Sequence, residues 1–267
     1  MARKSKSQTT DGGVTITLGG NHQYTVKGDP KVAPGRIPGV TSVIREANGS
    51  SLEPLMRWSQ DIIQNSARSN FLRTPYQGLT PWDDFVNNMM DVAAKEPDLA
   101  RDLGGAYGTQ VHEQIENRNP LLPESKAAVA FMEAENIKTV ATEFYVYSAE
   151  HTYAGSIDLL GQVEGSDELL ILDWKTGYVD DGCALQIGAY CMAFKEMYPD
   201  LKTSGAIIKL VCDAETGING YEVMPVNLEY AQAQFLDARK LYARRREDEE
   251  VESDGGKKRR QRKSLWT

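Results

Sequence analysis

One stretch of the sequence constrains the fold more than any other: Leu169-Leu170-Ile171-Leu172-Asp173-Trp174-Lys175-Thr176-Gly177. Its apolar run predicts a β-strand that is covered on both faces. Asp173 and Lys175 are two residues apart, so their side chains leave the same face of that strand. Burying charge costs free energy, so a carboxylate and an ammonium at the end of such a strand need an explanation. A salt bridge, or simply the end of the strand, would be the simplest one.

A second acid lies in the preceding apolar stretch, Ala154-Gly155-Ser156-Ile157-Asp158-Leu159-Leu160. If the two strands pair, Asp158 and Asp173 approach each other at one end of the sheet. Two close carboxylates repel each other unless a cation lies between them. Because oxygen ligands suit Mg²⁺ and Mn²⁺, the pair predicts a divalent metal site.

The remaining pattern predicts a mixed sheet flanked by helices. Strands are expected over 139–147, 153–163, 168–174, 206–211 and 221–224, with helices over 103–117, 124–136, 184–198 and 228–246. The first third is mainly helical, with a hairpin at 14–18 and 23–26, a loop over 28–39, and helices over 41–47, 52–71 and from Pro81 onward. This order predicts an α/β fold, a mixed central sheet flanked by helices with a helical N-terminal part packed on it.

Two of the expected helices carry polar pairs on one face. His112 and Glu116 are four residues apart, and so are Gln186 and Tyr190. The second pair could present an amide and a phenol to a backbone phosphate. Taken alone, core packing explains each pair better than ligand binding does.

Charge is distributed unevenly along the chain. The 267 residues include 30 Lys and Arg against 38 Asp and Glu, for a formal net charge of −8. Near the C-terminus an acidic block over 247–254 is followed by Gly255-Gly256 and a basic block over 257–263. Such blocks repel themselves and are expected to be disordered. The basic block is either a solvated end or a mobile arm that binds phosphates.

The cysteines and the hydropathy exclude several protein classes. The three cysteines are odd in number and none lies in a C-x-x-C pair, which makes a disulfide framework or a structural zinc site improbable. No stretch approaches the roughly 18 apolar residues that a membrane span needs. The polar, basic N-terminus lacks the apolar run of a secretory signal. We therefore expect a cytoplasmic protein that does not enter a membrane.

Taken together, four motifs resemble the RecB-type nuclease domain of the PD-(D/E)XK (restriction-endonuclease-like) superfamily. They are G-T-x-x-H ending at His112, G-S-I-D ending at Asp158, D-W-K-T beginning at Asp173, and Q-x-x-x-Y from Gln186 to Tyr190. The resemblance covers about residues 104–225. Each motif is weak alone, but the combination in this order is specific.

The N-terminal part has a weaker resemblance of its own. Ile37-Pro38-Gly39-Val40-Thr41-Ser42-Val43-Ile44, followed by Trp58, is similar to the lead-in of the mitochondrial genome maintenance exonucleases and related phage exonucleases.

The nuclease resemblance implies a metal site and its chemistry. His112, Asp158 and Asp173 would ligate Mg²⁺ or Mn²⁺, one or two ions, together with the backbone carbonyl of Trp174. Lys175 would orient or activate the attacking water and stabilise the charge of the transition state.

The resemblance assigns supporting roles to four further residues. Gln186 and Tyr190 would help to hold the substrate strand and the active site. Glu143 matches a position where many relatives carry an acid, and Glu116 could act behind the ligands or only pack. Some relatives also carry an iron–sulfur cluster; this chain lacks the upstream cysteine and the C-terminal trio, so no cluster is expected.

These features predict a metal-dependent DNA exonuclease that acts in phage or bacterial DNA replication, recombination or repair, on DNA with a single-stranded end. A structure-specific endonuclease on the same fold is an open alternative. So is a catalytically inactive nucleic-acid-binding protein, although the intact Asp158, Asp173 and Lys175 argue against it.

The chain is expected to divide into three parts. Residues 1–100 would form a wall of the DNA channel, 101–246 the nuclease core, and 247–267 a charged, disordered tail that could also dock a replication or recombination protein. The aromatic residues of the first part could stack on unpaired bases, although packing explains any one of them better; they are Trp58, Phe71, Tyr76 and Trp82.

Overall fold

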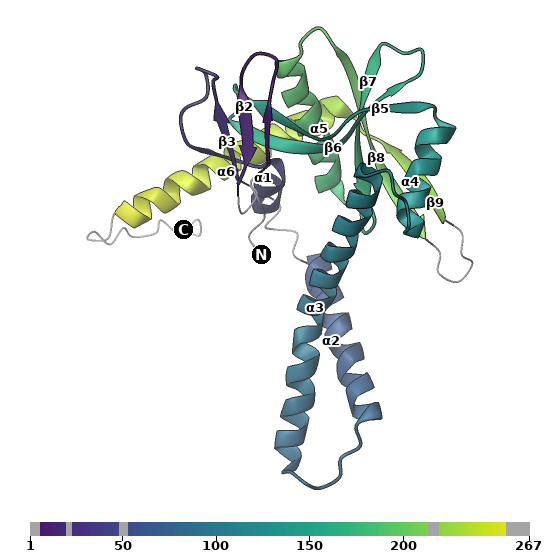
Figure 1. Cartoon of the computed structure of the whole chain (residues 1–267). Coiled ribbons are helices and arrows are strands. Elements are labelled where there is room, and N and C mark those ends of the chain that lie inside the picture. The colour runs from purple at the N-terminus through teal and green to yellow at the C-terminus, as the bar shows by residue number, and fades with distance from the viewer. Residues whose placement is uncertain (1–5, 20–22, 48–52, 213–218, 255–267) are drawn as a thin grey trace.

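The computed structural model of the chain describes residues 6–19, 23–47, 53–212 and 219–254. These residues form two sheets and six helices (Figure 1). The strands are β1 (Lys6–Thr9), β2 (Thr15–Leu18), β3 (Gln23–Lys27), β4 (Arg36–Pro38), β5 (Ile137–Ser148), β6 (Tyr153–Val163), β7 (Glu168–Lys175), β8 (Lys202–Cys212) and β9 (Asn219–Pro225). The helices are α1 (Val40–Ala47), α2 (Glu53–Arg73), α3 (Trp82–Glu116), α4 (Pro123–Ala134), α5 (Asp181–Met197) and α6 (Leu228–Asp254).

The larger sheet has the strand order β5-β6-β7-β8-β9. Strands β7 and β8 run parallel, with α5 as the crossover between them, and the other neighbouring strands pair antiparallel. The sheet is therefore mixed, and helices cover it (Figure 1). This confirms the predicted α/β fold with a mixed central sheet flanked by helices.

Strand β7 is buried on both faces, as its apolar run predicts. Ile171 belongs to a core cluster with Phe194 of α5 and with side chains of α1 and α6. The next residue, Leu172, points to the opposite face and packs in a second cluster with Phe131 of α4. The larger sheet thus lies between two helical layers.

The N-terminal strands form a separate antiparallel sheet in the order β1-β2-β3-β4. The predicted hairpin is present, since Ile16 of β2 pairs with Val26 of β3. The predicted loop over 28–39 is wrong in part, because Arg36–Pro38 forms β4 and pairs with β3. The edge strands β1 and β4 are short, and they are polar or contain proline. Their sequences therefore show little of the alternation that predicts a strand. Gln8 of β1 joins the sheets, because its amide bonds both backbone groups of Tyr145.

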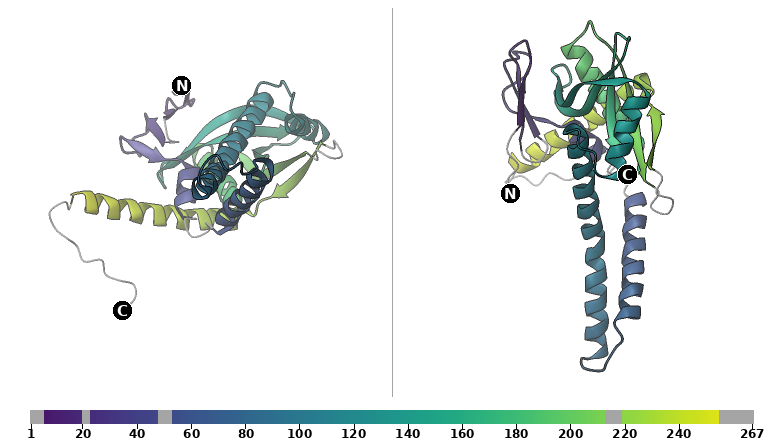
Figure 2. Two further views of the ribbon diagram at one scale, coloured as in Figure 1. Left: turned by 90° about the horizontal axis from the view of Figure 1, so that it is seen from below. Right: turned by 45° about the vertical axis from the view of Figure 1, so that its right-hand side comes forward.

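Helices α2 and α3 form a hairpin that projects from the core (Figures 1 and 2). We call α2, the connection over 74–81 and residues 82–103 of α3 the arm. The sequence predicted two helices where α3 is a single helix of 35 residues with Pro97 inside it. Proline normally disrupts a helix interior. Here Pro97 is buried, so packing compensates for the lost hydrogen bond. The expected boundary at residue 100 lies inside α3.

The C-terminal helix is longer than predicted. Helix α6 continues to Asp254, so residues 247–254, expected to be disordered, are helical. Extending a formed helix costs far less than nucleating one, and glutamate is a good helix former. Residues 255–267, with the basic block, lie outside the described residues. None of the described helices is long and apolar enough to cross a lipid bilayer.

Candidate active site

The two motif aspartates lie where β6 and β7 diverge. The β6–β7 ladder ends at the pair Leu159↔Leu172, and Asp158 and Asp173 are the next residue on each strand. The Asp158 side chain is 14% exposed and that of Asp173 only 1%. The backbone N–H of Trp174 still bridges the opening, because it donates to Oδ2 of Asp158 at 3.0 Å. The fold thus holds both carboxylates at one end of the central ladder.

A polar network from β7 and α5 surrounds Asp173. The Lys175 ammonium forms an ion pair with Oδ2 of Asp173. Nε2 of Gln186 donates to Oδ1 of Asp173 at 3.0 Å and to the Tyr190 hydroxyl at 2.8 Å. Oε1 of Gln186 accepts from Lys175 at 3.4 Å. Both amide hydrogens of Gln186 are therefore used within the protein.

Two roles are expected for the α5 pair, contact with a substrate phosphate and support of the active site. The sequence suggested that Gln186 and Tyr190 could contact a substrate phosphate, but Tyr190 is 3% exposed and its hydroxyl points to Gln186. A Cβ on Gly155 would lie 2.3 Å from the Tyr190 ring, so the glycine of the G-S-I-D motif makes room for that ring. In the structure Gln186 contacts Asp173 and Lys175, and Tyr190 contacts Gln186, which fits the second role.

His112 reaches the acids from the core-proximal end of α3. Its Nδ1 lies 3.5 Å from Oδ2 of Asp158, and its Nε2 lies 3.2 Å from the carbonyl oxygen of Trp174. Burial lowers the pKa of His112, and the acids Asp173 and Glu143 only partly oppose that effect. The imidazole is therefore neutral near pH 7, the form that can ligate a metal.

Glu143 lies opposite Asp158 across the β5–β6 ladder, between the pairs Thr142↔Leu159 and Phe144↔Ile157. Its φ is 49°, a left-handed conformation that a non-glycine residue in a strand adopts only at a cost of about 1–3 kcal/mol. Ser156 donates to its carboxylate at 3.1 Å. Such strain is concentrated at functional sites, which gives Glu143 more weight than its loose spacing in the sequence did.

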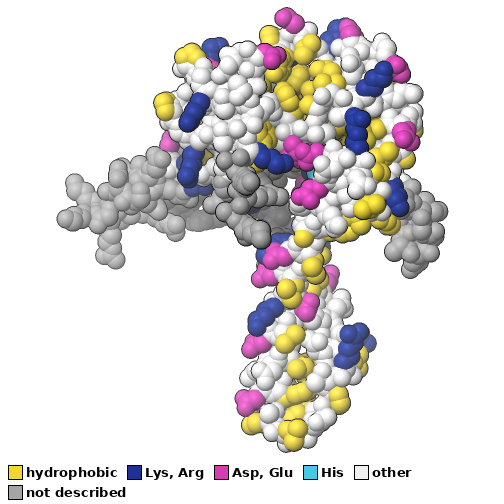
Figure 3. All heavy atoms as spheres, viewed as in Figure 1, with side chains coloured by type: hydrophobic (Ala, Val, Ile, Leu, Met, Phe, Trp, Pro, Cys, Tyr) yellow, Lys and Arg dark blue, Asp and Glu magenta, His cyan; other side chains and the backbone are white. Residues whose placement is uncertain are grey.

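The site combines ligand atoms that a metal ion requires. Ligand atoms of His112, Glu143 and Asp158 lie within 4.8 Å of one another. Glu116 is not part of that group among the described residues; it ends α3, within electrostatic range of Tyr145. Figure 3 shows acidic side chains with a histidine beside them where the arm meets the core.

Electrostatics show that the site lacks positive charge. Burial raises the pKa of Asp158, the neighbouring Asp173 raises it further, and Lys175 opposes both effects. Burial opposes the charge of Lys175, but the two aspartates outweigh it and its pKa is raised. The buried Oδ2 of Asp173 is paired with the Lys175 ammonium, and no hydrogen bond from another described group reaches it. Three carboxylates, including that of Glu143, thus gather with one ammonium, and a divalent cation fits this donor set.

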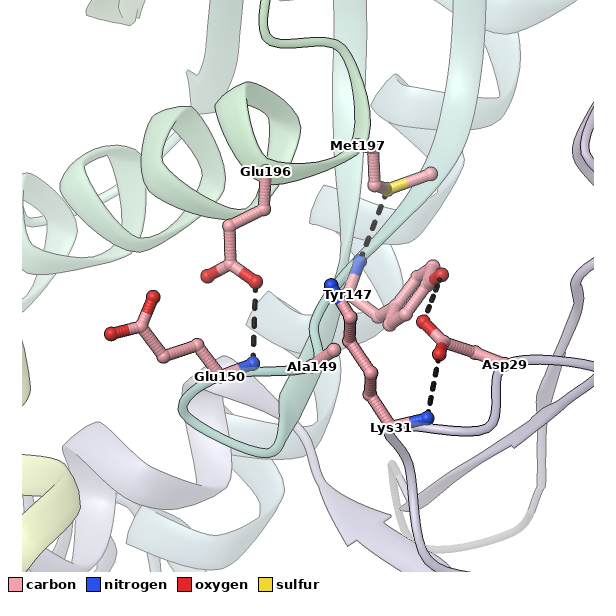
Figure 4. Close-up of a pocket in the computed structure, with 7 residues that line it drawn as sticks. All are labelled: Asp29, Lys31, Tyr147, Ala149, Glu150, Glu196 and Met197. Atoms are coloured by element: carbon pink, nitrogen blue, oxygen red, sulfur yellow. Dashed lines mark hydrogen bonds between the residues drawn. The ribbon is translucent and has the colours of Figure 1, made fainter.

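A second polar group lies away from these residues, around a pocket of about 440 Å³ between the N-terminal sheet and the end of α5 (Figure 4). There Tyr147 donates to Asp29 at 2.9 Å. Glu196 accepts from Ser148 and from the backbone N–H of Glu150. Glu150, His151 and Glu196 have ligand atoms within 4.8 Å, but Glu150 is 74% exposed and Glu196 is already hydrogen-bonded. The Tyr147–Asp29 bond links β5 to the segment after β3, and Glu196 links α5 to the end of β5 and the turn that follows it.

The sequence comparisons agree with this geometry. The model of the PD-(D/E)XK nuclease superfamily matches residues 61–261, which is more than half of the chain. No curated protein sequence matches the chain.

Proposed function

Since the chain belongs to the PD-(D/E)XK nuclease superfamily, we propose that it is a metal-dependent exonuclease that hydrolyses phosphodiester bonds in DNA. One observation carries the proposal: Asp158, Asp173 and Lys175 meet at the divergence of β6 and β7, with His112 and Glu143 beside them. A structural ion pair would need one acid for Lys175. The additional acids, Asp158 and Glu143, are partly buried and have no such use without a cation.

The metal would be held by side chains from four elements. His112 of α3, Glu143 of β5, and Asp158 and Asp173 of β6 and β7 would bind Mg²⁺ or Mn²⁺, with the Trp174 carbonyl as a further ligand. A divalent ion bound there lowers the pKa of water and neutralises phosphate oxygens. Fixing Asp158 through the Trp174 N–H keeps this donor set in place before metal arrives.

Lys175 would supply the second electrostatic component. Its raised pKa keeps the ammonium charged at neutral pH. A fixed cation beside the scissile phosphate stabilises the negative charge that builds in the transition state. Gln186 and Tyr190 would act as positioning residues, because they hold the carboxylate of Asp173 and the ammonium of Lys175.

We assign the DNA-wall role to the core-proximal end of α3 rather than to the whole N-terminal part. Trp82 is 30 residues from His112 along α3, which corresponds to about 45 Å of helix. The aromatic side chains around Trp82 are therefore too distant to stack on bases at the acids. Residues 104–111, next to His112, would flank the DNA instead.

The exonuclease mode, the RecB-type subfamily and a role in phage or bacterial DNA replication, recombination or repair rest on the motif resemblance. The test is digestion of end-labelled single- and double-stranded DNA with Mg²⁺ or Mn²⁺, beside covalently closed circular DNA and an EDTA control. Stepwise products from ends, with the circle intact, support the proposal. Cleavage of the circle would identify an endonuclease instead, and metal-independent or absent cleavage would reject the enzyme.

The basic block over 257–263 would strengthen DNA binding without taking part in the chemistry. Each phosphate that it neutralises contributes about 0.9 to the salt slope on duplex DNA and about 0.7 on single strands. Deleting residues 255–267 should therefore flatten log affinity against log salt by up to about 4–5 units. An unchanged slope would leave the block as a solvated end, a targeting signal, or a docking arm for another protein.

A further inference from the structure

The arm exposes apolar side chains that its own two helices do not cover. Two buried residues of α3, Ala93 and Pro97, lie on the side that packs against α2. Beside them is a second stripe, in which Val92, Leu99 and Leu103 are spaced at i, i+7 and i+11 and so share one face. They are 46%, 53% and 71% exposed. Figure 3 shows hydrophobic side chains along the length of the arm.

The tip of the arm also exposes apolar side chains. Phe71, Tyr76, Trp82 and Phe85 pack around the connection, with ring centroids 5.0–6.0 Å apart. Yet Trp82 remains 53% exposed and Leu79 is 85% exposed. Exposed apolar side chains gathered at the tip and along one side of α3 are typical of a docking surface.

The charges of the arm indicate what docks there. Residues 82–103 of α3 carry six acids against two bases. Helix α2 carries three arginines against two acids. The arm as a whole is therefore acidic, which disfavours the phosphates of DNA. Its two helices are opposite in sign, so an arm of the same sequence offers the complementary pattern.

We propose that two copies of the chain associate through their arms, which pack antiparallel into a four-helix bundle. In such a bundle each α2 lies between two copies of α3, so every neighbouring pair of helices has opposite charge. The stripe of Val92, Leu99 and Leu103 is covered by the partner arm. The two nuclease cores lie at opposite ends, which separates two chains of net charge −8 and leaves both acid clusters accessible.

The size of the arm sets the expected affinity. Helix α2 has 21 residues, or about 31 Å of helix. A face of that length and two helices wide is on the order of 600 Å² per copy, and the resulting total lies at the lower end of specific interfaces. The dissociation constant of the dimer is therefore expected to be in the micromolar range. Dimer formation is not expected to depend on DNA or metal.

The first test is the mass of the full-length protein in solution, by sedimentation equilibrium from about 1 to 100 μM with EDTA. The wild type is expected to pass from monomer to dimer. Leu99→Glu in the stripe should raise the dissociation constant at least tenfold. Asn87→Glu, an exposed position about 120° away on α3, is the matched control and should leave it unchanged. Circular dichroism checks that both variants keep their helix content.

The second test separates charge pairing between the arms from non-specific hydrophobic association. One variant reverses two charges of α2 (Arg68→Glu with Arg73→Glu). Another reverses two charges of α3 (Asp91→Lys with Asp98→Lys). Each alone should be mainly monomeric, and an equimolar mixture should form the heterodimer.

Three results would overturn the proposal. A wild type that stays monomeric at 100 μM would assign the stripe to another protein. A dimer that Leu99→Glu does not weaken would place the interface elsewhere. A dimer that is lost on deleting residues 255–267 would mean that the basic tail, and not the arm stripe, joins the copies.

Discussion

The core and the arm differ in which side chains they bury: the core buries charged groups, and the arm exposes apolar ones. In the core, the buried Asp173 is paired with the partly buried Lys175, and the apolar run of β7 is covered on both faces. In the arm, the paired Asp98 and Arg101 are solvated, and Leu99 and Leu103 are more than half exposed. Buried charge that is not needed for the fold indicates chemistry, whereas exposed apolar surface indicates association. The same residue types should therefore respond differently to substitution in the two regions.

The largest difference is expected for an aspartate. Asp173→Asn keeps the acceptor for Gln186 but removes a charged ligand, so cleavage should fall by at least about 100-fold, the scale seen when metal sites lose even an outer partner. Asp91→Asn in the arm should leave the rate unchanged. Single-turnover cleavage at saturating Mn²⁺ measures both. A normal rate for Asp173→Asn would remove this residue from the site.

A lysine gives the next largest contrast. Lys175→Ala should retain metal binding but lower single-turnover cleavage by about 100-fold, or roughly 2.7 kcal/mol, as for other groups that stabilise transition-state charge. Lys95→Ala in the arm should have no effect on the rate. Calorimetric Mn²⁺ affinity is measured beside the rate. If Lys175→Ala weakened metal binding and left the saturated rate intact, the lysine would be structural.

An amide gives a smaller contrast. Gln186→Ala frees Asp173 and Lys175 without removing either, so kcat should fall by about tenfold while KM for DNA changes little. Gln60→Ala in α2 is the matched control. The kcat and KM values separate two roles, because a rise in KM with unchanged kcat would instead mean that Gln186 binds the phosphate directly.

The smallest effect is on stability and depends on pH. Burial raises the pKa of Asp158 above that of the unfolded chain, so ionising it costs stability as the pH rises from about 3.8 through the folded-state pKa. Without metal, Asp158→Asn should therefore melt a few degrees higher than the wild type at pH 7, since 1 kcal/mol corresponds to about 2–4 °C at this size.

The control for that effect is Asp98→Asn, whose exposed ion pair with Arg101 contributes little. The gain of Asp158→Asn should disappear as the pH falls toward 4, and Mn²⁺ should stabilise the wild type more than the variant. A melting temperature that rises equally at all pH values would argue against a charge effect.

Much of the core was readable from the sequence because its signals are local. The strands β6 and β7 follow from apolar runs, and the four motifs named most of the residues that the structure gathers. Glu143 was harder to recognise, since its place opposite Asp158 depends on the register of β5 with β6. No local pattern in the chain specifies that its φ is 49°.

The helix boundaries of the arm were predicted less accurately than the strands of the core, because they depend on packing and not on local pattern alone. Pro97 favours an end to the helix, but α3 runs through it and Pro97 is buried. The helix also runs through the exposed Gly104 and Gly105. Likewise, the acidic block at 247–254 looks disordered by charge alone, but it extends a helix that α6 has already nucleated.

The sequence by itself determined the chemistry available to this protein: the order of its strands, the acids at their ends, and a lysine two residues from Asp173. Tertiary structure decided how these groups are used. It turned Gln186 and Tyr190 inward to Asp173, brought His112 to the Trp174 carbonyl, and directed the arm away from the core. The reason is that residue spacing fixes which face a side chain takes, whereas contacts between distant segments depend on register and packing.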